Sequence, residues 1–309
     1  MHLREQQRAE DHRQVQTVLS YILLTTDTIL VLLCCPFFCW WAVRRGSLTL
    51  GGALAAVAIA LSVTFSIGSF YLLPLLVFFG SSTLIGKFLP SQQVAADDNH
   101  GKARNAIQVL ANGGLYAIVA ILSYLHVLRA DKELGDIILM VPTTPDDAYY
   151  YALYVLAAIA TADTWSSEVG QYFSQPTYDL LRGKKVPPGL SGGVSVSGSV
   201  AGLAGSFLIA LLSLIDPRLT GSQVLMITCA GFLGMLIDSL LGASLQSTYY
   251  DSQRDLLLDS QLTGSTLARG YAWMTNDLVN LLALAIGLLV WYFLLYPFFL
   301  GFSSPPVVL

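Results

Sequence analysis

The sequence predicts an all-α membrane protein, a polytopic bundle of about eight helices. Two observations support this prediction. Hydrophobic residues make up 54% of the 309 residues, charged residues make up only 12%, and the mean hydropathy is +0.62. Soluble domains average about 25% charged residues, so this composition is typical of a chain that lies mostly in lipid. The apolar residues are also gathered into long runs, each near the length that one helix needs to cross a bilayer.

Eight runs are long enough to be membrane segments. Pro74 is expected to kink the third run. Seven or nine spans are the alternatives, because the second and third runs follow each other too closely to guarantee that both cross. The runs are residues 17–43, 48–67, 69–89, 105–127, 148–170, 192–215, 223–245 and 274–300.

These runs form one predicted membrane domain, residues 17–300, between a polar N-terminal arm, residues 1–16, and a short tail, residues 301–309. The arm mixes basic and acidic residues, whereas transit peptides are poor in acids, so no removable targeting segment is expected. Asp27 lies in the first run among threonines, apart from the other acids, and a structural role is favoured for it.

The charges predict an orientation and argue against one class of partner. If all eight runs cross, ten of the 16 basic residues lie in the loops after runs one, three, five and seven or, for Lys87, at the end of the third run. The positive-inside rule places these loops in the cytoplasm. The net charge of −4 argues against nucleic acid as a partner. The four cysteines lie in apolar runs without zinc-site spacing, and we interpret them as buried thiols.

The fifth run ends in the stretch 161–170, which holds Asp163 and Glu168. A charged side chain at the bilayer centre costs about 2.5–3.5 kcal/mol on insertion scales, so such residues usually serve a function. On an ideal helix the two carboxylates point about 140° apart. They serve one site only if neighbouring helices enclose this helix end or if the helix unwinds.

Further polar residues lie at the ends of three other runs. Under the eight-span topology every one of them lies near the same, basic membrane face, which predicts a single site there. They are Asn105, Gln108 and Asn112 at the start of the fourth run, Asp238 and Gln246 at the end of the seventh, and Asn276, Asp277 and Asn280 at the start of the eighth.

The loop 184–195 places two lysines and a glycine-rich turn directly before the sixth run. Ser191 is a predicted N-cap, and free backbone N–H groups at a helix start favour phosphate. A glycine-rich turn is also common where membrane helices begin, so a structural role is the alternative. Beyond it, Gly198, Gly202 and Gly205 form a stripe of small residues that predicts close helix packing.

These residue types suit Mg²⁺ and a polyphosphate. Magnesium prefers oxygen ligands and is commonly held by one or two carboxylates together with substrate phosphates. The metal and Lys185 would offset charge on a transferred phosphoryl group. In the structural alternative, Asp238 is a satisfied polar group and residues 276–280 only cap the eighth helix. The chain has no His-x-x-x-His motif that would indicate zinc hydrolysis.

Five blocks, spread over roughly residues 45–295, also carry a family resemblance: Arg104-Asn...Gln108...Asn112-Gly, Ala162-Asp-Thr-Trp-Ser-Ser-Glu-Val-Gly170, Val186-Pro...Gly192-Gly-Val-Ser195, Asp238-Ser-Leu-Leu-Gly-Ala243 with Gln246, and Asn276...Val279-Asn280. These blocks resemble the transmembrane protein 19 family, which includes plant phytyl-phosphate kinase. The resemblance implies a multi-pass enzyme that phosphorylates an isoprenoid monophosphate, with CTP or ATP as the donor.

Motifs and resemblance together define the predicted site. Asp163, Glu168 and Lys185 are the predicted catalytic residues. The predicted magnesium ligands are Asp163, Glu168, Asp238 and Asp277. The predicted substrate- and phosphate-binding residues are Arg104, Asn105, Gln108, Asn112, Gly192, Gly193, Ser195, Asn276 and Asn280.

The expected partners are membrane lipid, an isoprenoid phosphate and a nucleotide. The expected location is an endomembrane such as the endoplasmic reticulum, or the plastid envelope, with the active face in the cytoplasm. A membrane transporter for an anionic or prenylated solute is the alternative function, although transporter sites usually lie near the bilayer midplane.

Overall fold

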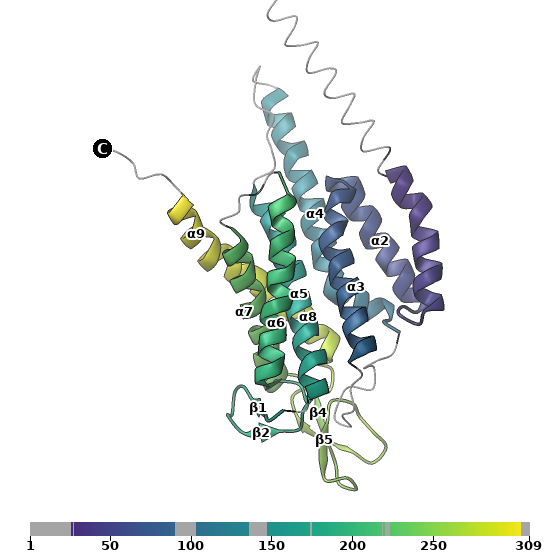
Figure 1. Ribbon diagram of the computed structural model, residues 1–309, viewed down its shortest axis with the longest axis vertical. Helices are drawn as coiled ribbons and strands as arrows, with labels where there is room; N and C mark the ends of the chain where they lie inside the picture. Colours follow the sequence, from purple (N-terminus) through teal and green to yellow (C-terminus); the bar gives the residue numbers. More distant parts are fainter. Residues whose placement is uncertain are drawn as a thin grey trace, which may run out of the picture.

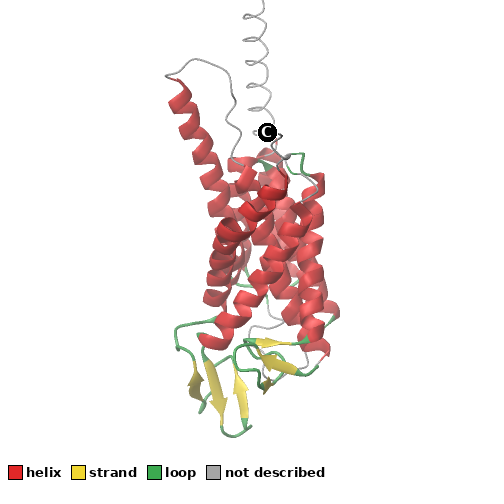
Figure 2. Ribbon diagram, turned by 90° about the vertical axis from the view of Figure 1, so that its left-hand side faces the viewer, coloured by secondary structure: helices red, strands yellow, loops and turns green. Residues whose placement is uncertain are grey.

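The computed structural model describes residues 26, 28–89, 103–135, 147–173, 175–217, 219 and 223–303. Long helices form a bundle, and two small β-sheets lie together at one end of it (Figures 1 and 2). The predicted multi-pass helical architecture is therefore confirmed. The predicted arm, residues 1–16, and Asp27 lie outside the described residues.

The described helices follow the eight predicted runs. Six stretches, all but the first helix and α5, are long and apolar enough to cross a membrane. Pro74 lies in the first turn of α3, where its missing N–H is tolerated, so it begins this helix instead of kinking it. The elements are the helix Thr28–Arg44, α2 Leu50–Ile67, η1 Ser69–Leu72, α3 Leu73–Phe88, α4 Ala106–Gly135, α5 Asp147–Phe173, α6 Val196–Leu212, η2 Ser213–Ile215, α7 Gln223–Ser244, α8 Asn276–Val290, η3 Trp291–Leu295 and α9 Tyr296–Ser303.

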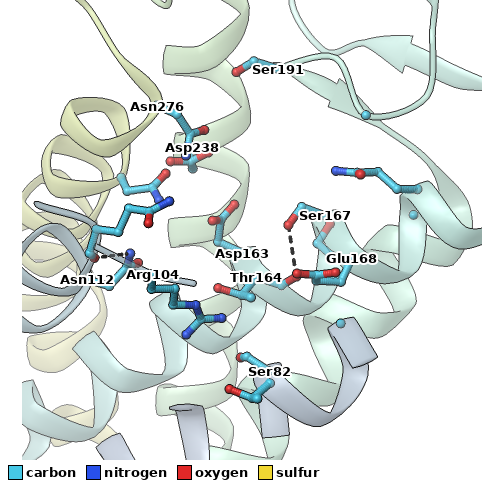
Figure 3. A pocket seen from close by; sticks show the side chains of 18 of the residues that line it. Ser82, Arg104, Asn112, Asp163, Thr164, Ser167, Glu168, Ser191, Asp238 and Asn276 are labelled. Atoms are coloured by element: carbon cyan, nitrogen blue, oxygen red, sulfur yellow. Dashed lines mark hydrogen bonds between the residues drawn. The ribbon is translucent and has the colours of Figure 1, made fainter. Parts of the chain in front are cut away.

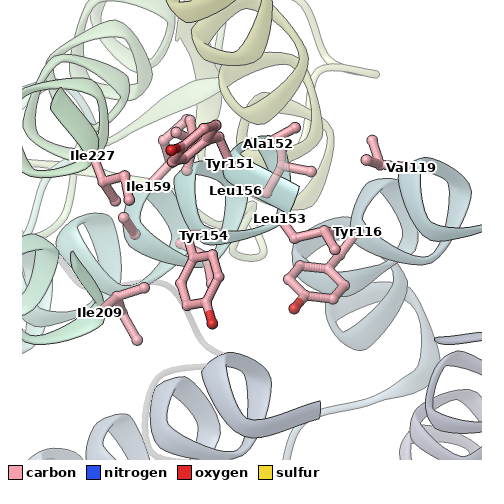
Figure 4. Packing of buried hydrophobic residues seen from close by; sticks show 14 of the residues in the cluster. Tyr116, Val119, Tyr151, Ala152, Leu153, Tyr154, Leu156, Ile159, Ile209 and Ile227 are labelled. Atoms are coloured by element: carbon pink, nitrogen blue, oxygen red, sulfur yellow. The ribbon is translucent and has the colours of Figure 1, made fainter. Parts of the chain in front are cut away.

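The helix α5 is the centre of the bundle. It packs against α3, α4, α6, α7 and α8, and every residue from 150 to 162 is buried. Figure 4 shows part of this core, with Leu153 and Leu156 of α5 among residues of the neighbouring helices. Among these, the Tyr154 hydroxyl donates a hydrogen bond to Asp216 Oδ2 at 3.4 Å. Because protein rather than lipid covers it, α5 can carry tyrosines, Asp163 and Glu168 at low cost.

The glycines of α6 bring it into close contact with α5, as the small-residue stripe predicts. A methyl group added to Gly198 would lie 2.8 Å from the carbonyl oxygen of Ser166, and one added to Gly202 would lie 3.0 Å from that of Ala162. A methyl group added to Gly205 would lie 3.1 Å from the ring of Trp165. Larger side chains would force the two helices apart.

Two antiparallel sheets occupy the loops that follow α5 and α7, and the sequence analysis missed both. Their strands are only two to four residues long, whereas strands average about 5–6 residues. Such short strands show no recognisable alternation of apolar and polar residues in the sequence. The first sheet has the order β2-β1-β3 and the second β5-β4-β6. The strands are β1 Thr177–Asp179, β2 Lys185–Val186, β3 Gly193–Val194, β4 Thr248–Asp251, β5 Leu256–Leu258 and β6 Thr266–Arg269.

Candidate functional site

A polar cavity of about 830 Å³ opens at the sheet end of the bundle. Its size lies within the range of about 300–1,000 Å³ that is usual for ligand sites. Every predicted site residue except Lys185 and Asn105 lines it. Additional lining residues include Arg44, Arg45, Ser82, Lys87 and Asp259.

Asp163 on α5 and Asp238 on α7 both line the cavity, and their carboxyl groups lie close enough to interact with each other (Figure 3). The Asn280 amide nitrogen donates to Asp238 Oδ1 at 3.1 Å when the amide is oriented to satisfy both groups. Two carboxylates this close repel each other unless a proton or a cation lies between them. The pair therefore offers oxygen ligands of the kind that Mg²⁺ prefers.

Glu168 lies on the other face of α5, against α3. A methyl group added to Gly86 would lie 3.3 Å from both carboxylate oxygens of Glu168. The helix α5 stays regular to Phe173, and α7 and α3 pack against it on two sides. Enclosure by neighbouring helices, rather than unwinding, therefore brings both carboxylates to the cavity.

The four predicted carboxylate ligands are not gathered into one cluster. Within the described residues, no three His, Cys, Asp or Glu side chains are grouped closely enough to hold a metal ion. Asp277 lines the cavity from the first turn of α8. A magnesium ion here would thus depend on the Asp163–Asp238 pair and on oxygens from amides or substrate phosphates, which is its common mode of binding.

Arg104 lies at the cavity wall, where its guanidinium group stacks on two aromatic rings. Its Cζ is 5.6 Å from the ring centres of both Phe78 and Phe79. Burial lowers the pKa of Arg104, and the charge of Glu168 acts in the opposite direction. The backbone N–H of Arg104 donates to Ser47 at 3.0 Å and its carbonyl accepts from Thr49 at 3.0 Å, so the main chain holds it in place.

Asn105 and Gln108 cap the start of α4 reciprocally. The backbone N–H of Asn105 donates to Gln108 Oε1 at 2.9 Å, and the backbone N–H of Gln108 donates to Asn105 Oδ1 at 3.0 Å. Asn112 Nδ2 donates to the Gln108 carbonyl oxygen at 3.0 Å. Asn105 therefore has a capping role, while Gln108 and Asn112 face the cavity.

The structure places Lys185 outside the cavity lining. It lies exposed in β2, paired with Tyr178 of β1. The basic residues that do line the cavity include Lys87, in the last turn of α3, and Arg44 and Arg45 at the end of the first helix. In the sequence, the only sign of these three residues was their position at the ends of apolar runs.

The N-cap of α6 lies four residues after the predicted cap. Ser195 is the N-cap, because its Oγ accepts a hydrogen bond from the backbone N–H of Gly198 at 3.2 Å. Ser191 instead connects the loop after α5 to the loop after α7. Its N–H donates to Asp259 Oδ2 and its hydroxyl to Gln246 Oε1, both at 2.7 Å. The assignment of Ser191 as the cap is therefore wrong.

Gly192 holds the glycine-rich turn against the end of α7. Its φ is +80°, and an added Cβ would collide with the backbone of Ala243. We predict that Gly192→Ala lowers the melting temperature by much more than Gly183→Ala. Gly183 has a similar φ of +63° but open space around it, so the comparison separates the collision from the backbone strain. Equal shifts in thermal unfolding would contradict the tight packing of this turn.

An ion-pair network around the buried Asp179 joins the two sheets beside the cavity. Asp179 Oδ2 accepts hydrogen bonds from Arg269 Nη1 at 2.8 Å and Arg182 Nη1 at 3.0 Å. Arg269 Nη2 also donates to the carbonyl oxygen of Ser191 at 2.9 Å, and Arg182 Nη1 to that of Ala243 at 2.9 Å. The network ties the glycine-rich turn to both sheets and to α7.

Asp179 makes the stability of this region depend on pH. Burial alone would raise its pKa, but hydrogen bonds from Arg182 and Leu181 outweigh burial and lower it. The stabilisation is therefore complete above the ordinary aspartate pKa of about 3.9 and is lost as pH falls through the lower folded-state pKa. We predict that Asp179→Asn lowers the melting temperature at pH 7 and that the difference from wild type narrows below about pH 4. A difference independent of pH would show that the charge of Asp179 is not responsible.

Ser82 was missed by the sequence analysis. Its hydroxyl is buried, lines the cavity and has no hydrogen-bond partner among the described residues. Buried polar groups are normally paired, so an unpaired one facing a cavity indicates a ligand or water contact. A serine in an apolar run carries no distinctive sequence signal.

Comparisons with known proteins identify relatives of this chain. Protein PGR of Arabidopsis thaliana is 29% identical over 258 residues, which cover 79% of this chain and 87% of that protein. Protein VTE6, chloroplastic, of the same plant is 29% identical over 129 residues, or 42% of this chain and 33% of that protein. An uncharacterized membrane protein of Synechocystis sp. is 28% identical over 133 residues, or 42% and 43% of the two chains.

No solved structure matches the chain significantly. The family model described as Integral membrane protein DUF92 matches residues 33–288, which is most of the sequence. The chain therefore belongs to the DUF92 family of integral membrane proteins.

Proposed function

We propose that this protein is a prenyl-phosphate kinase that uses Mg²⁺ and transfers the γ-phosphoryl group of CTP or ATP to a membrane isoprenoid monophosphate. The bond between the γ-phosphorus and the β–γ bridging oxygen breaks, and a new P–O bond forms to an acceptor phosphate oxygen. The products are a nucleoside diphosphate and a prenyl diphosphate.

One observation carries this proposal: the polar cavity combines a facing carboxylate pair with several basic side chains at one membrane face. Phosphoryl transfer is catalysed mainly by positioning and charge stabilisation, which requires both kinds of group. Asp163 and Asp238 would hold the magnesium ion, and the ion would offset negative charge on the phosphates. Lys87 and Arg104 would bind phosphate oxygens, and Ser82 would donate a hydrogen bond.

The family resemblance supports the acceptor, because the transmembrane protein 19 family includes plant phytyl-phosphate kinase. The cavity's position at the helix ends, rather than at the bilayer midplane, favours an enzyme over a transporter. We retain as proposals a location in an endomembrane or a plastid membrane and a cytoplasmic active face.

The proposal is tested with purified, well-folded protein reconstituted in vesicles. We expect prenyl diphosphate to form from phytyl or geranylgeranyl monophosphate with CTP or ATP, and only when Mg²⁺ is present. The same vesicles are assayed for uptake of labelled prenyl phosphate. Uptake without diphosphate formation across donors and chain lengths would favour the transporter alternative instead.

A further inference from the structure

A second, apolar cavity of about 320 Å³ adjoins the polar one. It lies among the helix Thr28–Arg44, α2, α3 and α4, which form one side of the bundle (Figure 1). Arg104, Gln108 and Asn112 line both cavities. Apart from these three residues, its walls consist of aliphatic, aromatic, thiol and glycine groups. The two spaces together fit a ligand with one charged end and one hydrocarbon end.

We propose that the apolar cavity holds the isoprenoid chain of the acceptor while the acceptor phosphate lies beyond Arg104 in the polar cavity. This inference rests on the proposed function, because it assumes that a prenyl phosphate is the substrate. It assigns the hydrocarbon chain to a groove inside the protein rather than to the surrounding lipid.

The shape of the cavity follows the direction that such a chain would take. Its wall extends from Cys39 to Val31 along the first helix and from Phe79 in α3 to Leu72, the last residue of η1. At 1.5 Å per residue these lengths are about 12 Å and about 10 Å. The hydrocarbon core of a bilayer is about 30 Å thick, so the cavity runs through much of one leaflet, away from the polar face.

Arg104 marks the boundary between the two spaces. Its guanidinium group stacks on Phe78 and Phe79, whose rings also line the apolar cavity, while the opposing charge of Glu168 lies on the polar side. A phosphate that pairs with Arg104 can therefore lie in the polar cavity with its hydrocarbon chain against the two rings. The junction fixes the orientation of an amphiphile.

Two alanines of α2 allow the cavity to be filled in steps. Ala56 and Ala60 both line it, with Ala60 one turn further from the polar face. Ala58, on the same helix, is exposed and does not line it. We expect Ala60→Phe to raise KM about tenfold or more for geranylgeranyl monophosphate but much less for geranyl monophosphate. Ala56→Phe should raise KM for both, and Ala58→Phe for neither.

Binding is measured independently of turnover with geranylgeranyl monophosphate that carries a photoreactive diazirine at the chain end. In the full-length reconstituted protein, we expect labelled peptides from the first helix, α2 and the start of α3. Unlabelled geranylgeranyl monophosphate should displace the label, whereas excess phospholipid should not. Ala60→Phe should lower the labelling, and Ala58→Phe should leave it unchanged.

The outcomes separate this inference from the proposed function. Labelling at these peptides without turnover would support the chain site and count against the kinase activity. Turnover with labelling elsewhere, or with chain-length preference unchanged in Ala60→Phe, would overturn the chain site and leave the kinase standing. Labelling that phospholipid displaces would mean that an ordinary bilayer lipid occupies the cavity, and it would also overturn the inference.

Discussion

Asp163→Asn should lower phosphoryl transfer by several orders of magnitude while the melting temperature is retained. The substitution keeps the shape of the side chain and removes one of the two charges that would hold the metal with Asp238. Because the two carboxylates face each other, losing one charge also relieves repulsion, so stability should stay the same or rise.

Turnover per folded molecule and thermal unfolding are measured on the same preparation. Asp255→Asn is the matched control, since Asp255 is exposed in a turn of the second sheet and lies outside the cavity lining. Lost folding with normal activity per folded molecule would mean that Asp163 is structural. Near-normal turnover would remove it from the site.

Arg104→Gln should raise KM for the prenyl monophosphate about 10- to 100-fold. A hydrogen bond to a charged group contributes about 1.5–3 kcal/mol, and about 1.4 kcal/mol corresponds to a factor of ten. The fold should persist, because backbone hydrogen bonds to Ser47 and Thr49 position this segment. KM for the acceptor and the melting temperature are the two measurements.

Arg129→Gln is the control for this variant, because Arg129 is exposed on α4, well beyond the cavity end of the helix. Lys185→Ala should change KM far less than Arg104→Gln, since Lys185 lies outside the cavity lining. A larger effect for Lys185 would restore the role that the loop sequence suggests and contradict the placement of the phosphate near Arg104.

The helices and the side of the site could be predicted from the sequence because both depend on local information. Runs of about 20 apolar residues specify membrane helices directly. Successive membrane helices run in opposite directions, so counting eight runs tells which helix ends lie at the same membrane face. This count was enough to place Asp163, Asp238 and Asn280 at one face. The free-energy cost of placing a charge in a membrane span made Asp163 and Asp238 stand out as candidates.

The loops could not be predicted because their structure depends on distant contacts. Arg269 and Asp179 are separated by 90 positions in the chain, yet their ion pair joins the two sheets. The lysines before the glycine-rich turn resemble phosphate-binding residues in sequence, yet Lys185 is exposed in β2 and does not line the cavity. Ser191 resembles a helix cap in sequence, but its partners Gln246 and Asp259 lie in the loop region after α7.

The transfer of ³²P from the γ-position of labelled CTP or ATP tests the central claim most directly. The purified protein is incubated with Mg²⁺ and geranylgeranyl monophosphate, and the lipid products are separated. We predict label in the prenyl diphosphate, its loss in Asp163→Asn and its retention in Asp255→Asn. Label found only in inorganic phosphate, or no labelled lipid with either donor in well-folded protein, would contradict the account.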